Sequence, residues 1–238
     1  MIGPLRRIIP VGWQVFLLRL DGQSPLLMNS AEYDRAGDTY RAFRQLGGKR
    51  GKTLEDELRM SELEFHLALH YDEEIGPFVP GMNIKELLRS AATKWRKGEE
   101  VRRSLIVPEY RVPVLYDGPR DAAELFAAGF YDSRLVRNAG PSGGRVVRTR
   151  PMFEHWAVEA EVAIDPEDLD PDMLRSAVDR STKYGFGDGR SIGFGAFTPT
   201  LTFVREQREP SNADAVKPRD AAMVANGKAA DRRVRSAA

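Results

Sequence analysis

Hydrophobic and polar positions divide the chain into short strands and helices as far as about residue 208. Residues 13–20 are apolar on both faces, which predicts a central strand. Residues 156–164 alternate between apolar and polar side chains, which predicts a strand with one buried face. Less regular patterns predict four more strands, over residues 65–71, 112–115, 131–138 and from Phe197 to Phe203.

Two amphipathic helices are predicted between these strands. The first starts after Asn83, which suits an N-cap with Glu86 as its capping-box partner, and it ends at Gly98. The second covers residues 170–183 and has Asp170 as its N-cap. Their apolar stripes consist of Ile84, Leu87, Leu88, Ala91 and Trp95 in the first helix, and of Leu174, Ala177, Val178 and Ser181 in the second.

The order strand, helix, strand, strand, helix, strand is that of a split βαβ unit. The sequence therefore predicts an α+β protein with a ferredoxin-like (RRM-like) core. Insertions follow the first strand, with a helix at 54–63, and lie between the first helix and the third strand, with a helix at 122–127. In such a core the last strand lies at a sheet edge, which agrees with Pro199 within it.

Two domains of different character are expected from the composition. Residues 1–208 form the folded domain, whereas residues 209–238 have almost no large apolar side chains and are expected to be a disordered tail. Arg232, Arg233 and Arg235 make the end of this tail basic.

Composition excludes several classes of protein. The apolar fraction of 42% and the charged fraction of 30% are typical of a soluble globular protein. The chain has no cysteine, which excludes disulfides, thiolate metal sites and cysteine nucleophiles. We see neither a membrane-spanning run nor a secretory signal near Met1, so we expect a cytoplasmic protein.

Charge is informative through its distribution. The net charge of +1 does not by itself indicate a nucleic-acid partner. However, the segment from Ser133 to Pro151 contains five arginines and no acidic residue, and the first predicted helix region is also basic. Local stripes of this kind are what bind phosphates.

The strongest motif is the segment Gly185-Phe-Gly-Asp-Gly-Arg-Ser-Ile-Gly-Phe-Gly195, with five glycines in eleven residues. Glycines allow positive φ and close approach of the backbone. A dinucleotide-binding loop is excluded because Arg190 stands where the third glycine is needed and the loop precedes a strand. The motif also lacks the lysine of a P-loop. We interpret it either as a tight helix-to-strand turn or as a turn whose amides and Arg190 hold a phosphodiester backbone.

This loop resembles the glycine-rich signature of the RAMP superfamily, the repeat-associated proteins of CRISPR systems. The segment from Phe78 to Ala91 is similar to the Pro-Gly-containing segment of that family, and Ser24-Pro-Leu-Leu-Met28 resembles its Ser-Pro-Leu segment. The matches occur in the family's order. Met82, Asn83 and Glu86 depart from the family pattern, which leaves open a divergent protein encoded outside a CRISPR system, for example by a phage.

The resemblance implies a subunit that assembles side by side and binds single-stranded RNA or DNA, classically a guide RNA. Neither a cofactor nor a membrane is implied. Under this hypothesis the binding residues are Lys85, Arg89, Arg96, Arg134, Arg137, Arg145, Arg148, Arg150, Phe186, Gly187, Gly189 and Arg190. Phosphate contacts would make the affinity depend on salt, and aromatic rings such as Phe186 and Phe194 would stack on bases.

Two alternatives to binding remain open. Asp34 and Asp38 lie after the first strand, where some RAMP subunits that cleave RNA carry an aspartate, so a metal-dependent ribonuclease is one alternative. The other is a structural or assembly protein that keeps the fold without binding nucleic acid. His66 and His70 lie on a predicted strand, where four residues span about 13 Å, which is too far for one metal ion.

Overall fold

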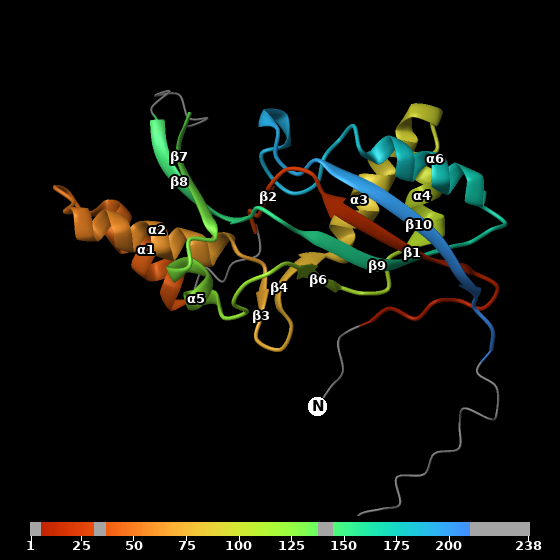
Figure 1. Ribbon diagram of the computed structural model, residues 1–238, viewed down its shortest axis with the longest axis horizontal. Helices are drawn as coiled ribbons and strands as arrows, with labels where there is room; N and C mark the ends of the chain where they lie inside the picture. Colours follow the sequence, from red (N-terminus) through yellow and green to blue (C-terminus); the bar gives the residue numbers. More distant parts are fainter. Residues whose placement is uncertain (1–5, 31–36, 138–144, 210–238) are drawn as a thin grey trace, which may run out of the picture. The chain divides into compact units, whose positions relative to one another are not determined.

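The computed structural model describes residues 6–30, 37–137 and 145–209 (Figure 1). The chain divides into two units, residues 1–207 and residues 208–238. The predicted tail, apart from Glu209, and the predicted loop at 140–144 lie outside the described residues. The elements of secondary structure in the described part of the chain belong to the first unit.

The larger sheet is antiparallel throughout and has seven strands in the described part of the chain. In spatial order they are β10 (Phe197–Glu206), β1 (Gln14–Gly22), β9 (Ala157–Ile164), β6 (Arg111–Leu115), β4 (Gly76–Pro80) and β3 (Tyr71–Asp72). A short strand, β5 (Leu105–Ile106), pairs with the end of β9 that β6 leaves uncovered. The protein is therefore a mixed α and β protein with antiparallel sheets.

The strands with the clearest sequence patterns are confirmed. β1 lies between β10 and β9, as its apolar character on both faces predicts. In β9, Val158 and Val162 are buried whereas Glu159 is exposed, so the alternation places one face in the core. β10 lies at the edge of the sheet, the position that tolerates Pro199.

Helices α3 (Gly81–Ala92), α4 (Gly98–Ser104) and α6 (Pro171–Ser181) gather on one side of this sheet, and α3 packs against α6 (Figure 1). Asp170 caps α6 by accepting a hydrogen bond from the amide of Asp172 (2.7 Å), as predicted. The buried stripes also agree with the prediction: Ile84, Leu87, Leu88 and Ala91 in α3, and Leu174, Ala177, Val178 and Ser181 in α6.

The predicted ends of α3 are wrong. The helix starts two residues before Asn83, because β4 leads directly into it and the amide of Gly81 donates to the carbonyl oxygen of Tyr110 (3.0 Å). It ends at Ala92, where a 3₁₀ turn, η1 (Thr93–Trp95), follows. Trp95 is therefore 42% exposed instead of completing the apolar stripe.

A smaller sheet and three helices form the insertions. Strands β2 (Leu26–Leu27), β8 (Arg145–Phe153) and β7 (Tyr131–Arg137) pair in that order. The sequence pattern does not predict β8. Figure 1 shows the β7–β8 hairpin beside α1 (Asp38–Gly48), α2 (Leu54–Ala68) and α5 (Ala122–Ala127). The helix predicted at 122–127 and the strand predicted at 131–138 are confirmed.

The strand predicted at 65–71 is wrong, since α2 continues through Ala68 and closes with a hydrogen bond from the amide of Leu69 to the carbonyl oxygen of Phe65 (3.0 Å). Phe65 and Leu69 are four residues apart, which is a helical spacing as well as an even one. Packing of α2 against β8 and α5 decides in favour of the helix.

Asp56 gives the start of α2 a pH dependence. Its carboxylate accepts hydrogen bonds from the amide (2.9 Å) and hydroxyl (3.0 Å) of Thr53. An ion pair with Lys49 and the Thr53 hydrogen bonds lower the pKa of Asp56 to about 2, from an ordinary value of 3.8. Because the folded pKa is the lower one, this stabilisation is complete above about pH 4 and is lost as the pH falls toward 2.

We therefore expect Asp56→Asn to increase amide hydrogen exchange in the first turn of α2 at pH 7, relative to wild type. The variant should lose little further protection between pH 4 and pH 2. Glu57→Gln is the control, because Glu57 is also in the first turn but takes no part in this capping box. Equal exchange in wild type and Asp56→Asn would contradict the expectation.

Candidate nucleic-acid interface

The glycine-rich loop joins α6 to β10 and contains a short 3₁₀ turn, η2 (Arg190–Ile192). All five of its glycines have positive φ, between 66° and 97°. The amide of Phe186 donates to the carbonyl oxygen of Gly195 (2.8 Å), and the amides of Asp188 and Gly195 donate to the carbonyl oxygens of Leu27 and Pro25 (2.9 Å each). The loop is therefore tied to itself and to β2.

Close packing explains two of these glycines. A Cβ on Gly187 would lie 2.6 Å from the carbonyl oxygen of Leu27, and a Cβ on Gly195 would lie 1.7 Å from that of Phe186. The prediction of positive φ and close backbone approach is thus confirmed, but the backbone that approaches belongs to this chain. The loop is a tightly built turn that presents its side chains in fixed positions.

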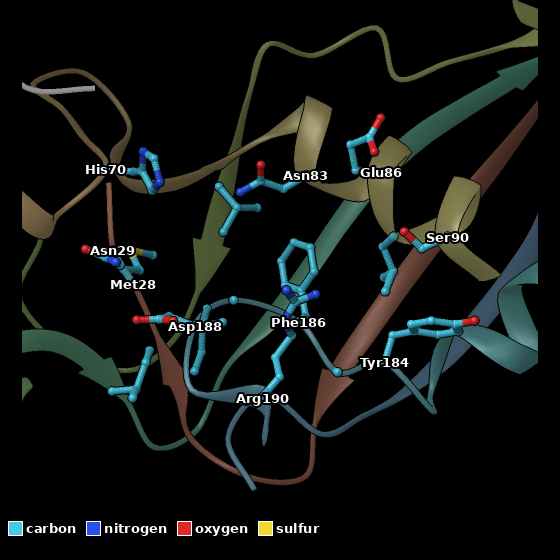
Figure 2. Close-up of a pocket in the computed structure, with 16 residues that line it drawn as sticks. Met28, Asn29, His70, Asn83, Glu86, Ser90, Tyr184, Phe186, Asp188 and Arg190 are labelled. Atoms are coloured by element: carbon cyan, nitrogen blue, oxygen red, sulfur yellow. The ribbon is translucent and has the colours of Figure 1, made fainter. Parts of the chain in front are cut away.

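A cleft of about 410 Å³ lies between this loop, α3 and the segment around β2. In Figure 2, Asn83, Glu86 and Ser90 project from α3, and Arg190 projects from the loop across the cleft. His70, Asn29 and Tyr184 complete much of its polar lining. The cleft is therefore an open, polar groove whose two walls come from distant parts of the sequence.

Arg190 is the free cation of this cleft. Its side chain is exposed, and no acidic group in the described part of the chain pairs with it. The two acids that line the cleft are each neutralised from its rim: Glu86 by Arg89 (2.7 Å) and Asp188 by Arg150 (2.9 Å). The cleft therefore carries an uncompensated positive charge at Arg190.

Phe186 occupies a different place from the one predicted. Its side chain is only 3% exposed and its ring stacks on that of Trp156 at 6.1 Å between centroids. Trp156 in turn donates from Nε1 to the carbonyl oxygen of Ser24 (2.8 Å). The prediction that Phe186 offers its ring to a base is corrected, because the ring belongs to the core beneath the loop.

The arginines of the β7–β8 hairpin lie opposite one another. Arg134 faces Arg148, and Arg137 faces Arg145, across the two strands. Arg134 is paired with Asp132 (2.6 Å) and lies over the ring of Phe194 at 4.7 Å. Arg148 is paired with Glu64 (2.6 Å). Arg145 is exposed, and the side chain of Arg137 lies outside the described part of the structure.

Lys85 and Arg96 are not brought to Arg190. Lys85 lines a second cavity, which shares no residue with the cleft. Arg96 follows the 3₁₀ turn beyond the end of α3, is exposed and has a left-handed backbone with φ of 61°. The structure therefore separates the predicted contacts into the cleft, the hairpin, the second cavity and the far end of α3.

The acidic and histidine candidates that the structure describes do not gather at one point. Asp34 lies outside the described residues, and Asp38 starts α1, where it pairs with Arg41 and does not line the cleft. His66 lies within α2 and His70 lies beyond its end. Among the described residues, no three His, Cys, Asp or Glu side chains gather as a metal ion requires.

The sheet face away from the helices is not a base-stacking platform. Leu17, Arg19 and Asp21 of β1 point to this face, because Phe16, Leu18 and Leu20 are buried in the core. Glu159 and Glu161 of β9 lie beside them, and Arg19 is paired with Asp21 (2.8 Å) and Glu159 (3.5 Å). Modules that bind single strands on such a sheet use exposed aromatic rings there, so the cleft is the better candidate.

No helix among the described residues is long and apolar enough to cross a membrane. No protein-family model and no curated protein sequence matches the chain. Solved structures do match. One protein chain in the cryo-EM structure of the type III-B Cmr-β complex bound to cognate target RNA aligns with a TM-score of 0.50 and 9% identity, over 81% of this chain and 61% of that one.

Two further solved structures are similar at lower scores. The crystal structure of Cmr6 from Pyrococcus furiosus has a TM-score of 0.39 and 10% identity, over 82% of this chain and 100% of that one. A protein of a type IV-B CRISPR complex has a TM-score of 0.41 and 12% identity, over 85% of this chain and 97% of that one.

Fold and cleft together define a mixed α and β protein whose glycine-rich loop presents a free arginine. This fold is shared with a protein chain of the type III-B Cmr-β structure, at 9% sequence identity. The chain spans about 61% of the length of that Cmr-β protein.

Proposed function

We propose that this protein binds single-stranded nucleic acid, with RNA as the first candidate, along the cleft between α3 and the glycine-rich loop. The observation that carries the proposal is the exposed, unpaired Arg190 in a cleft whose acids are already neutralised. A guanidinium binds phosphate oxygens through two parallel hydrogen bonds. The Cmr-β structure that contains a protein chain of the same fold is bound to target RNA, which supports RNA as the ligand.

The core that holds the cleft is, in this proposal, ferredoxin-like. Its support is the order β10, β1, β9 and then β5 or β6, with α3 and α6 on one face. That order brings the first and third strands of a split βαβ unit together in the middle of the sheet. The same order places the glycine-rich loop next to the start of α3. This loop is the connection between α6, the second helix of the unit, and β10, its last strand.

Polar groups of the cleft suit a chain of nucleotides. Asn83 and Ser90 project from α3 toward the cleft, where amide and hydroxyl groups can bind phosphate or base edges (Figure 2). Arg145, at the start of β8 in the hairpin, is a further exposed cation. In this proposal the binding is mainly electrostatic and falls as salt is added.

An assembly role is the second candidate, and one observation favours it. Leu135 and Val147 lie opposite each other on the hairpin and are 62% and 54% exposed. Exposed apolar pairs of this kind often belong to protein contacts. We propose that the subunit assembles with other protein subunits through the hairpin, whether or not nucleic acid is bound.

Arg190→Ala tests the binding proposal. We expect the variant to bind a labelled single-stranded RNA at least about tenfold more weakly, because the cleft loses its unpaired charge; tenfold corresponds to about 1.4 kcal/mol. The logarithmic salt slope of binding should become shallower by about 0.7, the value for one phosphate of a single strand. Fluorescence anisotropy across a salt series, with RNA, single-stranded DNA and duplex, measures both.

Arg102→Ala is the matched control, because Arg102 is an exposed arginine on α4 that pairs with Glu99 (2.8 Å) and does not line the cleft. The control should bind like wild type. If Arg190→Ala binds with unchanged affinity and salt slope, the cleft is not the binding site. If wild type shows no salt-dependent binding to any of the three nucleic acids, the assembly role becomes the better explanation.

A further inference from the structure

A second cavity, of about 450 Å³, lies at the start of α3 and is built from three distant segments. Gly81 brings two of them together: its amide donates to the carbonyl oxygen of Tyr110, and a Cβ there would lie 2.0 Å from the carbonyl oxygen of Glu109. The third segment is held by a hydrogen bond from the amide of Arg7 to the carbonyl oxygen of Pro108 (2.7 Å). Residue 81 must therefore be glycine for this wall of the cavity to form, because a side chain there would collide with the backbone of Glu109.

Two cations face this cavity without an acidic partner among the described residues: Lys85 from α3 and Arg7 from the N-terminal segment. The other charges at the cavity are matched, since Arg111 is paired with Asp72 and Glu109 with Arg6. Burial, followed by the charge of Arg7, lowers the pKa of Lys85. Lys85 and Arg7 line the same cavity, so an anion bound there would meet two positive charges.

The cavity also has an apolar side. Tyr110 is 47% exposed with the guanidinium of Arg7 at 5.1 Å from its ring centre, and Met82 is 51% exposed. An exposed ring, a thioether and a planar guanidinium are surfaces on which a nucleobase packs. The volume lies within the roughly 300–1,000 Å³ of small-molecule sites.

We propose that this cavity binds a nucleotide, with its phosphate monoester between Lys85 and Arg7 and its base against Tyr110 and Met82. The nucleotide is either free or the phosphorylated end of a strand. No residue of this cavity lines the cleft of Arg190, so the site is independent of the proposed function.

The test is isothermal titration calorimetry of the full chain with AMP, UMP and adenosine. It is combined with anisotropy of short RNA strands that carry either a 5′-phosphate or a 5′-hydroxyl group. We expect saturable binding of the monophosphates, with adenosine at least tenfold weaker, or a preference of at least tenfold for the 5′-phosphorylated strand. The first result identifies a free nucleotide as the ligand and the second a strand end.

Lys85→Gln and Arg7→Gln should each weaken this binding at least tenfold, and Lys85→Arg should restore most of it. Lys94→Gln is the control, because Lys94 is exposed in η1 and lines neither the cavity nor the cleft. Arg7→Gln keeps the test open if Lys85→Gln does not fold, since Arg7 precedes the first strand.

Three results would overturn the proposal: no saturable binding of either monophosphate and no preference for the 5′-phosphate, adenosine binding as tightly as AMP, or full affinity in both glutamine variants. Arg190→Ala should leave mononucleotide binding unchanged. The proposal for the cleft and the proposal for this cavity are therefore tested by different measurements, and one can fail while the other holds.

Discussion

Gly195→Ala is expected to disrupt the glycine-rich loop and to lower the free energy of unfolding by at least about 2 kcal/mol. A left-handed backbone costs an alanine about 1–2 kcal/mol, and residue 195 has a φ of +68°. In addition, the new Cβ would lie 1.7 Å from the carbonyl oxygen of Phe186, so the loop backbone must move. The melting temperature should fall by roughly 4–8 °C for a domain of this size.

Gly193→Ala is the matched control for this prediction. Gly193 also has positive φ, +97°, but a Cβ there would meet no atom within 4 Å. Gly193→Ala therefore bears only the conformational cost, and it should keep most of its nucleic-acid affinity while Gly195→Ala loses it. Urea unfolding and anisotropy check both variants. Equal effects would show that contact with Phe186 does not determine the loop.

Phe186→Ala is expected to cost about 3–5 kcal/mol of stability, the usual range for removing a buried aromatic ring. The ring is 3% exposed and stacks on Trp156, so its removal leaves a cavity beneath the loop. Phe186→Leu keeps most of the apolar volume and should bind RNA with wild-type affinity. Unfolding and binding measurements on both variants separate the two roles of this side chain.

A loss of RNA affinity in Phe186→Leu without a matching loss of stability would contradict the core assignment. It would instead support the base-stacking role that the sequence predicts for this ring. Trp156→Phe is a useful comparison, because it removes the Nε1 donor to Ser24 but leaves an aromatic neighbour for Phe186.

The sequence predicts those elements whose pattern depends on one buried face. β9 and α6 have regular alternation or a regular stripe, and Asp170 is a capping residue that acts within its own helix. By contrast, β8 has arginines at several positions and is a strand because β7 and β2 pair with it. Residues 65–71 satisfy both helical and strand spacing, so that packing against β8 decides the outcome.

The sequence indicates candidate residues for the site, but it does not indicate which of them the fold brings together. The glycine-rich loop and Arg190 line a cleft, whereas their predicted role in binding nucleic acid remains a prediction. Lys85, however, lies on a different face of α3 from Asn83, Glu86 and Ser90, because successive residues of an α-helix are about 100° apart around its axis. The second cavity is not predicted from the sequence, because its residues come from three distant segments that only folding brings together.

β2 is only two residues long, yet it links the loop to the hairpin. Leu27 pairs with Met152 of β8 and accepts the amide of Asp188, while Arg150 of β8 is paired with the Asp188 side chain. Arg134 of β7 lies over Phe194 of the loop. The loop is thus tied to the rest of the protein at several points, so the proposed binding of a strand at Arg190 would require little further ordering of the protein.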